Sequence, residues 1–94
     1  RDAADGTTLA VSNPSTGAAL GQIPNMGRAE AQQAVDAAAA ALPAWRALTA
    51  AQRAMLLKNW HRLILENKTA LAQIMTAEQG KPLAEAEGEI AYAA

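Results

Sequence analysis

The segment "TAAQRAMLLKNWHRLILEN", residues 49–67, carries the clearest structural signal in the chain. Thr49 followed three residues later by Gln52 is typical of a capping box, in which each residue satisfies a backbone N–H of the first helical turn. Apolar side chains then recur at three- and four-residue steps, at Leu56, Leu57, Trp60, Leu63 and Ile64. The pattern predicts an amphipathic helix that begins after Thr49 and ends near Asn67.

A second helix is expected before this segment. Gly27 can serve as its N-cap, with Glu30 three residues further on, and Pro43 is expected to prevent its continuation. Between them a single apolar stripe is formed by Ala31, Ala34, Val35, Ala38 and Leu42.

Two more helices are expected after it. Asn67 can end one helix and cap the next. Gly80 stands at the end of that next helix, where glycine commonly takes the left-handed conformation that closes a helix. Pro82 suits the first turn of a fourth helix, whose apolar stripe is Leu83, Ala86, Ile90 and Ala94. This last helix has no stop signal, so we expect it to be truncated and to continue beyond Ala94.

The N-terminal part has a different pattern. Residues 1–6 are polar or small and are expected to be disordered, and residues 7–24 contain two β-branched or apolar runs. Asn13, Pro14 and Gly17 between the runs favour a hairpin loop built on a type I turn. The expected fold is mainly α: a short β-hairpin over 7–24, then three to four packed helices over 27–94, forming one compact partial domain.

Composition limits the function classes. Eight basic and nine acidic residues give a net charge of −1, with no block of like charges, so neither nucleic acid nor an anionic membrane surface is an expected partner. The longest apolar run, residues 37–42, is too short to cross a bilayer. There is no cysteine, which excludes disulfides and thiolate sites within this chain. A cytoplasmic location is the default expectation.

Two charged groups invite a functional interpretation. Gly80 and Lys81 match the end of a phosphate-binding loop, but Met75 stands where that motif needs glycine and Pro82 where it needs Ser or Thr. A helix stop followed by a helix start is favoured instead. Glu85 and Glu89 would share a helix face, yet acids early in a helix are stabilised by its dipole without any catalytic role.

The remaining candidates also have simple structural interpretations. His61 is the single histidine, which makes a poor metal site without other ligands, so a surface or boundary position is favoured. Trp45 and Trp60 could stack on a ligand but fall where core anchors are expected. Glu78 has no partner that the sequence identifies. Residue by residue, the chain presents no site capable of chemistry.

Three stretches together carry a resemblance to a known family. "SNPSTGAALGQIPNMG", "ALPAWRALTAAQRAMLLKNWHRLILENKTALAQIMT" and "AEQGKPLAEAEGEIAYAA" resemble the N-terminal part of an aldehyde dehydrogenase. Within that family the likeness is closest to the bacterial NAD(P)-dependent succinate-semialdehyde dehydrogenases. It covers the chain from about Val11 onward, and the order and spacing of the motifs around Trp45-Arg46 make it specific.

The resemblance implies a parent enzyme several times longer, with an α/β coenzyme domain of which this chain is the N-terminal piece. In that family a cysteine thiolate attacks the aldehyde, hydride passes to NAD or NADP, and a glutamate activates water. None of these catalytic or coenzyme-binding motifs falls within this chain, so by itself it is expected to be inactive. The resemblance also implies a monovalent cation site near Val11, Ser12 and Glu89, as found in some family members.

Two hypotheses follow. In the first, the chain is a fragment of an oxidoreductase that converts succinate semialdehyde or a similar aldehyde to the acid, and its partners are the rest of the parent enzyme or another copy of itself. In the second, it is a self-contained helical protein-interaction module. The second predicts a monodisperse species that melts cooperatively.

Overall fold

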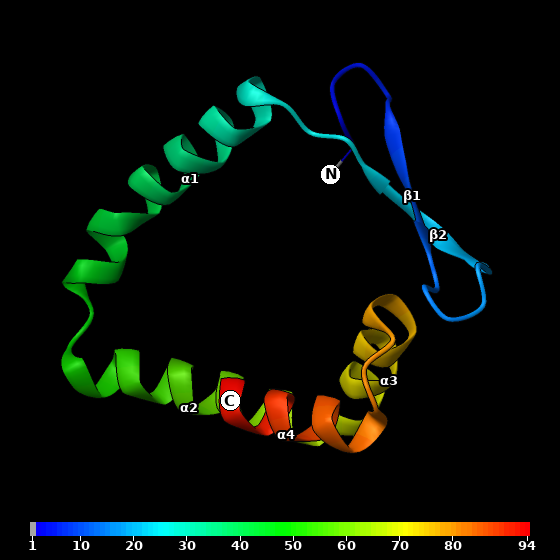
Figure 1. Ribbon diagram of the computed structural model, residues 1–94. Helices are drawn as coiled ribbons and strands as arrows, with labels where there is room; N and C mark the ends of the chain where they lie inside the picture. Colours follow the sequence, from blue (N-terminus) through cyan, green and yellow to red (C-terminus); the bar gives the residue numbers. More distant parts are fainter. Residues whose placement is uncertain (1) are drawn as a thin grey trace.

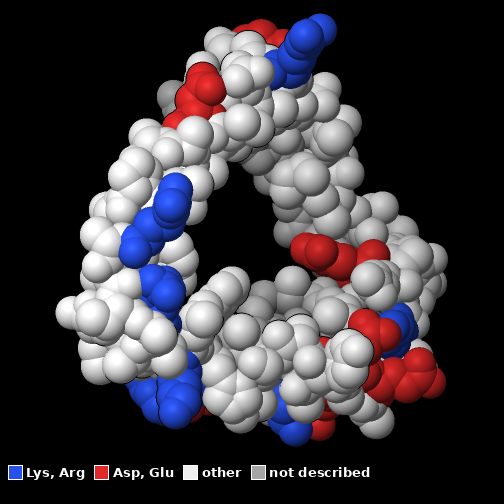
Figure 2. All heavy atoms as spheres, turned by 90° about the vertical axis from the view of Figure 1, so that its left-hand side faces the viewer, with Lys and Arg blue, Asp and Glu red and all other residues white. Residues whose placement is uncertain are grey.

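A computed structural model describes residues 2–94, and these form two strands followed by four helices (Figure 1). The elements are β1 (Thr8–Ser12), β2 (Ala19–Pro24), α1 (Arg28–Ala47), α2 (Ala50–Glu66), α3 (Lys68–Gln79) and α4 (Leu83–Ala93). The expected hairpin followed by helices is confirmed. The elements follow one another around an open outline, and the space-filling view in Figure 2 shows an opening through its middle.

The two strands form an antiparallel hairpin as expected. Thr8 pairs with Pro24 and Val11 with Gly21, and the register shifts by one residue between Val11 and Ser12. In the loop, the Asn13 side chain accepts hydrogen bonds from the backbone N–H groups of Ser15 and Thr16. Gly17 takes a φ of 72°, which glycine adopts without a steric penalty.

The N-terminal turn is held against the start of α1. The N–H of Gly6 donates to the carbonyl of Ala3 (3.0 Å), and the N–H of Ala4 donates to the Glu30 carboxylate (2.9 Å). Ala3 is buried, with 7% of its surface exposed. The expectation of disorder over residues 1–6 did not foresee the hydrogen bond from Ala4, because it depends on a residue 26 positions away. Arg1 lies outside the described residues.

Helix α1 passes through Pro43 and ends at Ala47, so the expectation that Pro43 ends the helix was wrong. Proline removes the N–H that would bond the carbonyl of Ala39, a cost of about 3 kcal/mol in a helix interior. Ala39 is exposed, so its carbonyl can be hydrated instead. The helix ends where Leu48 takes an extended conformation and its N–H bonds the carbonyl of Trp45.

The caps of α2 follow the expected chemistry. Thr49 accepts a hydrogen bond from the N–H of Gln52, and the Gln52 side chain accepts one from the N–H of Thr49 (2.8 Å), which confirms the capping box. Asn67 separates α2 from α3 as expected. Its side chain, however, donates to the carbonyl of Leu63 (2.8 Å) at the end of α2 and makes no cap bond to α3.

Helices α3 and α4 form the most extensive contact between helices. Ala72 of α3 and Ala86 of α4 are completely buried, and small side chains at such positions allow the helix axes to approach closely. Between the two helices Gly80 takes a φ of 75° and ends α3, as expected from the sequence. Pro82 is the N-cap of α4, one residue before its first turn.

The hairpin touches the helices at this same connection. A Cβ atom on Gly80 would lie 3.1 Å from Cγ of Pro14 and 3.3 Å from Oγ of Ser15, so the hairpin loop lies directly against it. Figure 1 shows the loop between β1 and β2 beside α3 and the α3–α4 connection. This contact brings together two parts of the chain that lie more than 60 residues apart in the sequence.

The described residues enclose almost no core. The buried apolar residues are Ala3, Ala72 and Ala86. The radius of gyration is 17.3 Å, whereas a compact chain of this length has about 12 Å. The expectation of a compact unit was therefore wrong: the stripes that the sequence predicts do form, but most of them face solvent because nothing in residues 2–94 lies against them.

Among residues 2–94, no helix has the length and apolar character that crossing a bilayer requires.

The contact at Gly80 predicts the cost of adding a methyl group there. Gly80→Ala should destabilise the chain by more than about 1 kcal/mol, because the left-handed backbone and the contact with Pro14 both oppose a Cβ. Thermal unfolding followed by circular dichroism would measure the change.

Two other glycines provide matched controls. Gly17→Ala meets a positive φ but no neighbour within 4 Å, so it should cost less than Gly80→Ala. Gly88→Ala lies within α4 with open space around it and should stabilise by up to about 1 kcal/mol. Equal effects of Gly80→Ala and Gly17→Ala would contradict a contact between the hairpin and the helices.

Candidate functional site

The carboxylates of α4 are engaged in structural ion pairs. Lys81 donates to the carboxylate of Glu89, and Lys68 lies 3.9 Å from that of Glu87. These pairs join α4 to the residues before it and to the start of α3. They account for two of the three acids without any chemistry, and Glu85 lies in the first turn of α4 as the helix dipole favours.

The residues proposed for a cation site lie on two separate elements. Val11 and Ser12 belong to β1, where Val11 is half-buried and Ser12 is exposed. Glu89 belongs to α4 and is paired with Lys81. Among residues 2–94, no hydrogen bond or ion pair joins Glu89 to either strand residue, so the site at Val11, Ser12 and Glu89 stays a prediction.

The Gly80-Lys81 pair has the geometry of a helix connection. Gly80 adopts the left-handed conformation with its N–H bonded to the carbonyl of Thr76 (2.9 Å), and the Lys81 side chain turns to Glu89. Both features belong to a helix end followed by a helix start, as the sequence favoured. Glu78, near the end of α3, is exposed.

His61 and Trp60 line a small hollow between α2 and the end of α4. It has a volume of about 210 Å³ and is completed by Leu57, Ile64, Ala93 and Ala94. Nδ1 of His61 lies 2.7 Å from the carbonyl oxygen of Ala94. Because a carbonyl oxygen can only accept, Nδ1 must carry the proton, and the ring ties α2 to the end of α4.

Neither tryptophan is a core residue within the described part of the chain. Trp45 has 38% and Trp60 has 63% of its surface exposed. The interpretation of both as core anchors is therefore wrong for residues 2–94, because the helices that carry them have nothing packed against these faces. Sequence periodicity identified the apolar faces but could not say what covers them.

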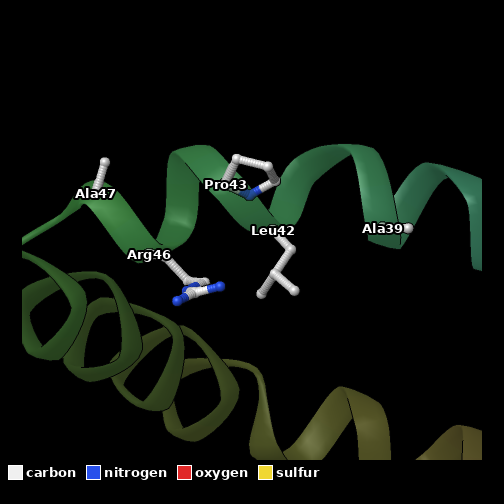
Figure 3. Close-up of a pocket in the computed structure, with 5 residues that line it drawn as sticks. All are labelled: Ala39, Leu42, Pro43, Arg46 and Ala47. Atoms are coloured by element: carbon white, nitrogen blue, oxygen red, sulfur yellow. The ribbon is translucent and has the colours of Figure 1, made fainter.

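A second hollow lies along α1 beside the internal proline (Figure 3). It has a volume of about 450 Å³ and is lined by Ala39, Leu42, Pro43, Arg46 and Ala47. Leu42 and Arg46 point to the same side of the helix in the close-up. All five residues come from a single helix, so the hollow is an open surface that cannot enclose a small ligand.

A carboxylate at the start of α1 joins this helix to the N-terminal turn. One oxygen of Glu30 accepts from the N–H of Ala4 and the other from the N–H of Gly27, each at 2.9 Å. These hydrogen bonds, that from Ala4 foremost, hold the pKa of Glu30 below its ordinary value of 4.5. The sequence identified the bond to Gly27 through the capping pattern, but the bond to Ala4 has no sequence signal.

Metal-ligating side chains are dispersed over the described residues. Within residues 2–94, no three His, Asp or Glu side chains gather closely enough to hold a metal ion. The glycines do not form a nucleotide-binding loop, and the chain has no cysteine. What the described residues do present is surface: large apolar side chains on α1 and α2, exposed on an otherwise well-formed scaffold.

Comparison with known proteins explains this combination. The model of the aldehyde dehydrogenase family matches residues 1–94. A glutarate-semialdehyde dehydrogenase of Pseudomonas putida is 58% identical over 93 residues, which are 99% of this chain and 19% of that protein. The NADP(+) succinate-semialdehyde dehydrogenase of Escherichia coli K12 is 57% identical over 93 residues, with the same shares covered. A 3-sulfolactaldehyde dehydrogenase of Pseudomonas putida is 56% identical over 85 residues, 90% of this chain and 18% of that protein.

Solved structures agree with the sequence comparison. An NADP-dependent enzyme of E. coli superimposes with a TM-score of 0.96 at 56% identity, and a succinate-semialdehyde dehydrogenase from Burkholderia pseudomallei with 0.96 at 50% identity. Each match covers 99% of this chain and 19% of the other chain. The open fold is thus the fold that this segment has inside larger proteins, and the chain spans about a fifth of the length of the relatives it matches.

The Glu30 hydrogen bonds predict a pH-dependent attachment of the N-terminal turn. Because the pKa of folded Glu30 is lowered, its contribution is complete above pH 4.5 and is lost as the pH falls through the folded pKa. The amide proton of Ala4, followed by NMR exchange, should lose protection over this acidic range.

Two variants separate Glu30 from its surroundings. Hydrogen bonds from Thr7 also lower the pKa of Asp5, so protonation of Asp5 at acidic pH could weaken the same turn. Glu30→Gln is therefore needed to isolate the contribution of Glu30. This variant should remove most of the acidic transition at Ala4. Asp36→Asn should leave it unchanged, because Asp36 accepts only from Gln32 in its own helix. An Ala4 amide that exchanges equally fast at every pH would contradict the attachment.

Proposed function

We propose, because this chain belongs to the aldehyde dehydrogenase family, that the complete enzyme oxidises a small aldehyde carrying an acidic group to the corresponding carboxylic acid with NAD(P)+. Succinate semialdehyde is the preferred candidate substrate. The observation that carries the proposal is the identity of 57–58% to two semialdehyde dehydrogenases over 93 residues without a change of fold.

The names of these relatives support a substrate class. Glutarate semialdehyde, succinate semialdehyde and 3-sulfolactaldehyde each have an aldehyde and an acidic group on a short carbon chain. An enzyme similar to all three therefore fits a substrate with the same two groups. Which one it prefers depends on side chains that contact the substrate, and in this proposal those side chains belong to the rest of the enzyme.

The reaction balances with the coenzyme as oxidant. The aldehyde carbon loses a hydride to NAD(P)+, and water supplies the second oxygen of the acid. The products are the carboxylate, NAD(P)H and two protons. In this proposal the described residues take no part in these steps, and the nucleophile, the general base and the coenzyme site belong to the rest of the enzyme.

The role proposed for this chain is structural. It contributes the hairpin and helices of the outer layer of the coenzyme domain, and the rest of the enzyme covers the exposed faces of α1 and α2. By itself the chain is inactive in this proposal. The expected cytoplasmic location is part of the same proposal.

A self-contained helical interaction module is the second candidate. The four amphipathic helices favour it, because such helices commonly bind partner helices. Such a module must be stable by itself, which requires a core. The buried apolar residues among 2–94 are three alanines, and this near absence of a core opposes the module. The enzyme proposal accounts for the same helices and for the family match.

Expression of the complete coding gene tests the proposal. The full protein should reduce NAD(P)+ when succinate semialdehyde is supplied, as followed by the absorbance of NAD(P)H. The 94-residue chain, assayed in parallel, should show no turnover. Propanal lacks the acidic group, and its kcat/KM should be at least about tenfold lower. The reason is that the polar groups which bind the acid are left without a partner when propanal is bound.

The gene itself offers the contradicting outcome. A reading frame that stops after Ala94, with no cysteine and glutamate downstream, would exclude the enzyme. A full protein that is folded but equally active on propanal would keep the family and exclude the acidic substrate class.

A further inference from the structure

The N-terminal turn contains an Asp-Gly pair, Asp5 and Gly6, which has a chemistry of its own. In such a pair the backbone nitrogen of the glycine can attack the side-chain carboxyl carbon of the aspartate and close a five-membered ring. Glycine favours this attack because it has no Cβ to crowd the nitrogen or to restrict the backbone. Both reacting groups lie in the same two residues, so the reaction does not depend on what covers the helices.

The reaction balances without an oxidant or a coenzyme. When the carboxyl of Asp5 is protonated, a bond forms between the nitrogen of Gly6 and Cγ of Asp5, the nitrogen loses its proton, and water leaves. The product is a succinimide ring. Water then adds to one of the two ring carbonyls: opening at the side-chain carbonyl restores aspartate, and opening at the main-chain carbonyl gives isoaspartate.

The turn engages both reacting groups in hydrogen bonds. The N–H of Gly6 donates to the carbonyl of Ala3 (3.0 Å), and this bond must break before the nitrogen can lose its proton. One oxygen of the Asp5 carboxylate accepts from the backbone N–H of Thr7 (3.0 Å) and from the Thr7 hydroxyl (2.8 Å). The folded turn therefore opposes ring closure at the nitrogen and at the carboxyl.

The same hydrogen bonds favour the unreactive form of the carboxyl. Donation from the backbone N–H of Thr7 foremost, and then from its hydroxyl, holds the pKa of Asp5 below its ordinary value of 3.8. A carboxylate is a poor electrophile because its negative charge is spread over both oxygens. Glu30 and Arg28 are the other charged residues that line the hollow beside Asp5.

Glu30 fastens this turn to α1. The N–H of Ala4 donates to one of its carboxylate oxygens and the N–H of Gly27 to the other, each at 2.9 Å. Ala3, whose carbonyl holds Gly6, is buried. Longer solved proteins match 99% of this chain at a TM-score of 0.96, so we expect the turn to keep its place in the complete protein.

We propose that Asp5-Gly6 is a site of spontaneous isomerisation to isoaspartate in the complete protein, and that the turn fastened by Glu30 slows this modification. In isoaspartate the main chain passes through the side-chain carboxyl and is longer by one methylene group. The longer chain no longer fits the turn between Ala3 and Gly6, so the modification loosens the N-terminal turn from α1. The inference does not depend on the proposed enzymatic function.

Peptide mapping of the complete protein tests the site. The protein is incubated at neutral pH and digested with trypsin, which cleaves after arginine and releases residues 2–28 as one peptide. Isoaspartate should accumulate at Asp5, as detected with protein isoaspartyl methyltransferase and located by fragmentation in a mass spectrometer. Asp2, in the same peptide, should react far more slowly because Ala3 follows it. No isoaspartate at Asp5, or equal amounts at Asp2 and Asp5, overturns the proposal.

Unfolding and substitution of Glu30 test the restraint. In urea the complete protein should form isoaspartate at Asp5 at least about tenfold faster, because the hydrogen bonds to carboxylates that hold the turn are lost. Glu30→Ala should accelerate the modification in the folded protein. Gln52→Ala is the matched control, since Gln52 completes the same kind of capping box on α2. An unchanged rate in Glu30→Ala, or equal acceleration in both variants, overturns the role of Glu30.

The hydroxyl of Thr7 offers a second and milder test. Thr7→Val removes one of the two hydrogen bonds to Asp5 and should accelerate isomerisation about threefold, since the backbone bond remains. Thr8→Val is the matched control, because the hydroxyl of Thr8 donates to Gln22 instead (2.8 Å). It should leave the rate at Asp5 unchanged. Equal rates in the two variants, with unchanged thermal unfolding of both, overturn the restraint.

Discussion

The contact between the hairpin loop and Gly80 is the constraint on which the arrangement of the chain depends. Among residues 2–94, the main contacts between helices are the extensive one of α3 with α4 and a smaller one of α2 with α4, and α1 has no extensive contact with another helix. Gly80 meets two requirements at once, because it closes α3 with a φ of 75° and leaves room for Pro14 and Ser15. A side chain at this position would both strain the backbone and push the hairpin away from the helices. The outline in Figure 1 is closed here and by the hydrogen bonds of Glu30 at the opposite end of the hairpin.

The interactions that stabilise this fold are mostly local ones, which is unusual for a chain of this length. Apolar burial normally supplies the main stabilising contribution in a domain. Among residues 2–94, complete burial is reached only by small residues, Ala72 and Ala86. Local interactions remain: the capping box at Thr49, the left-handed cap at Gly80 and ion pairs such as Lys81–Glu89. Local caps contribute on the order of 1 kcal/mol each and surface ion pairs less, which cannot replace a core. The large apolar side chains of α1 and α2 stay exposed within residues 2–94, and in the proposed complete enzyme the rest of the protein covers them.

Membership of the aldehyde dehydrogenase family gives this exposure a physical meaning. The same fold occurs at a TM-score of 0.96 within solved structures of which it covers 19%. A segment of a larger domain needs correct local structure and the correct faces, and does not need to bury those faces by itself.

The sequence by itself determined the elements of this protein. Helix α2 was predicted from Thr49, Gln52 and its apolar period, the α3–α4 connection from Gly80 and Pro82, and the hairpin from Asn13, Pro14 and Gly17, because these signals act within a few residues along the chain. Only the tertiary structure decided how the elements lie: that α1 continues through Pro43, that Glu30 reaches Ala4, that the hairpin rests on Gly80, and that Trp45 and Trp60 are exposed. These features depend on solvent access and on contacts between residues distant in sequence, and periodicity reports which face of a helix is apolar but not what, if anything, is packed against it.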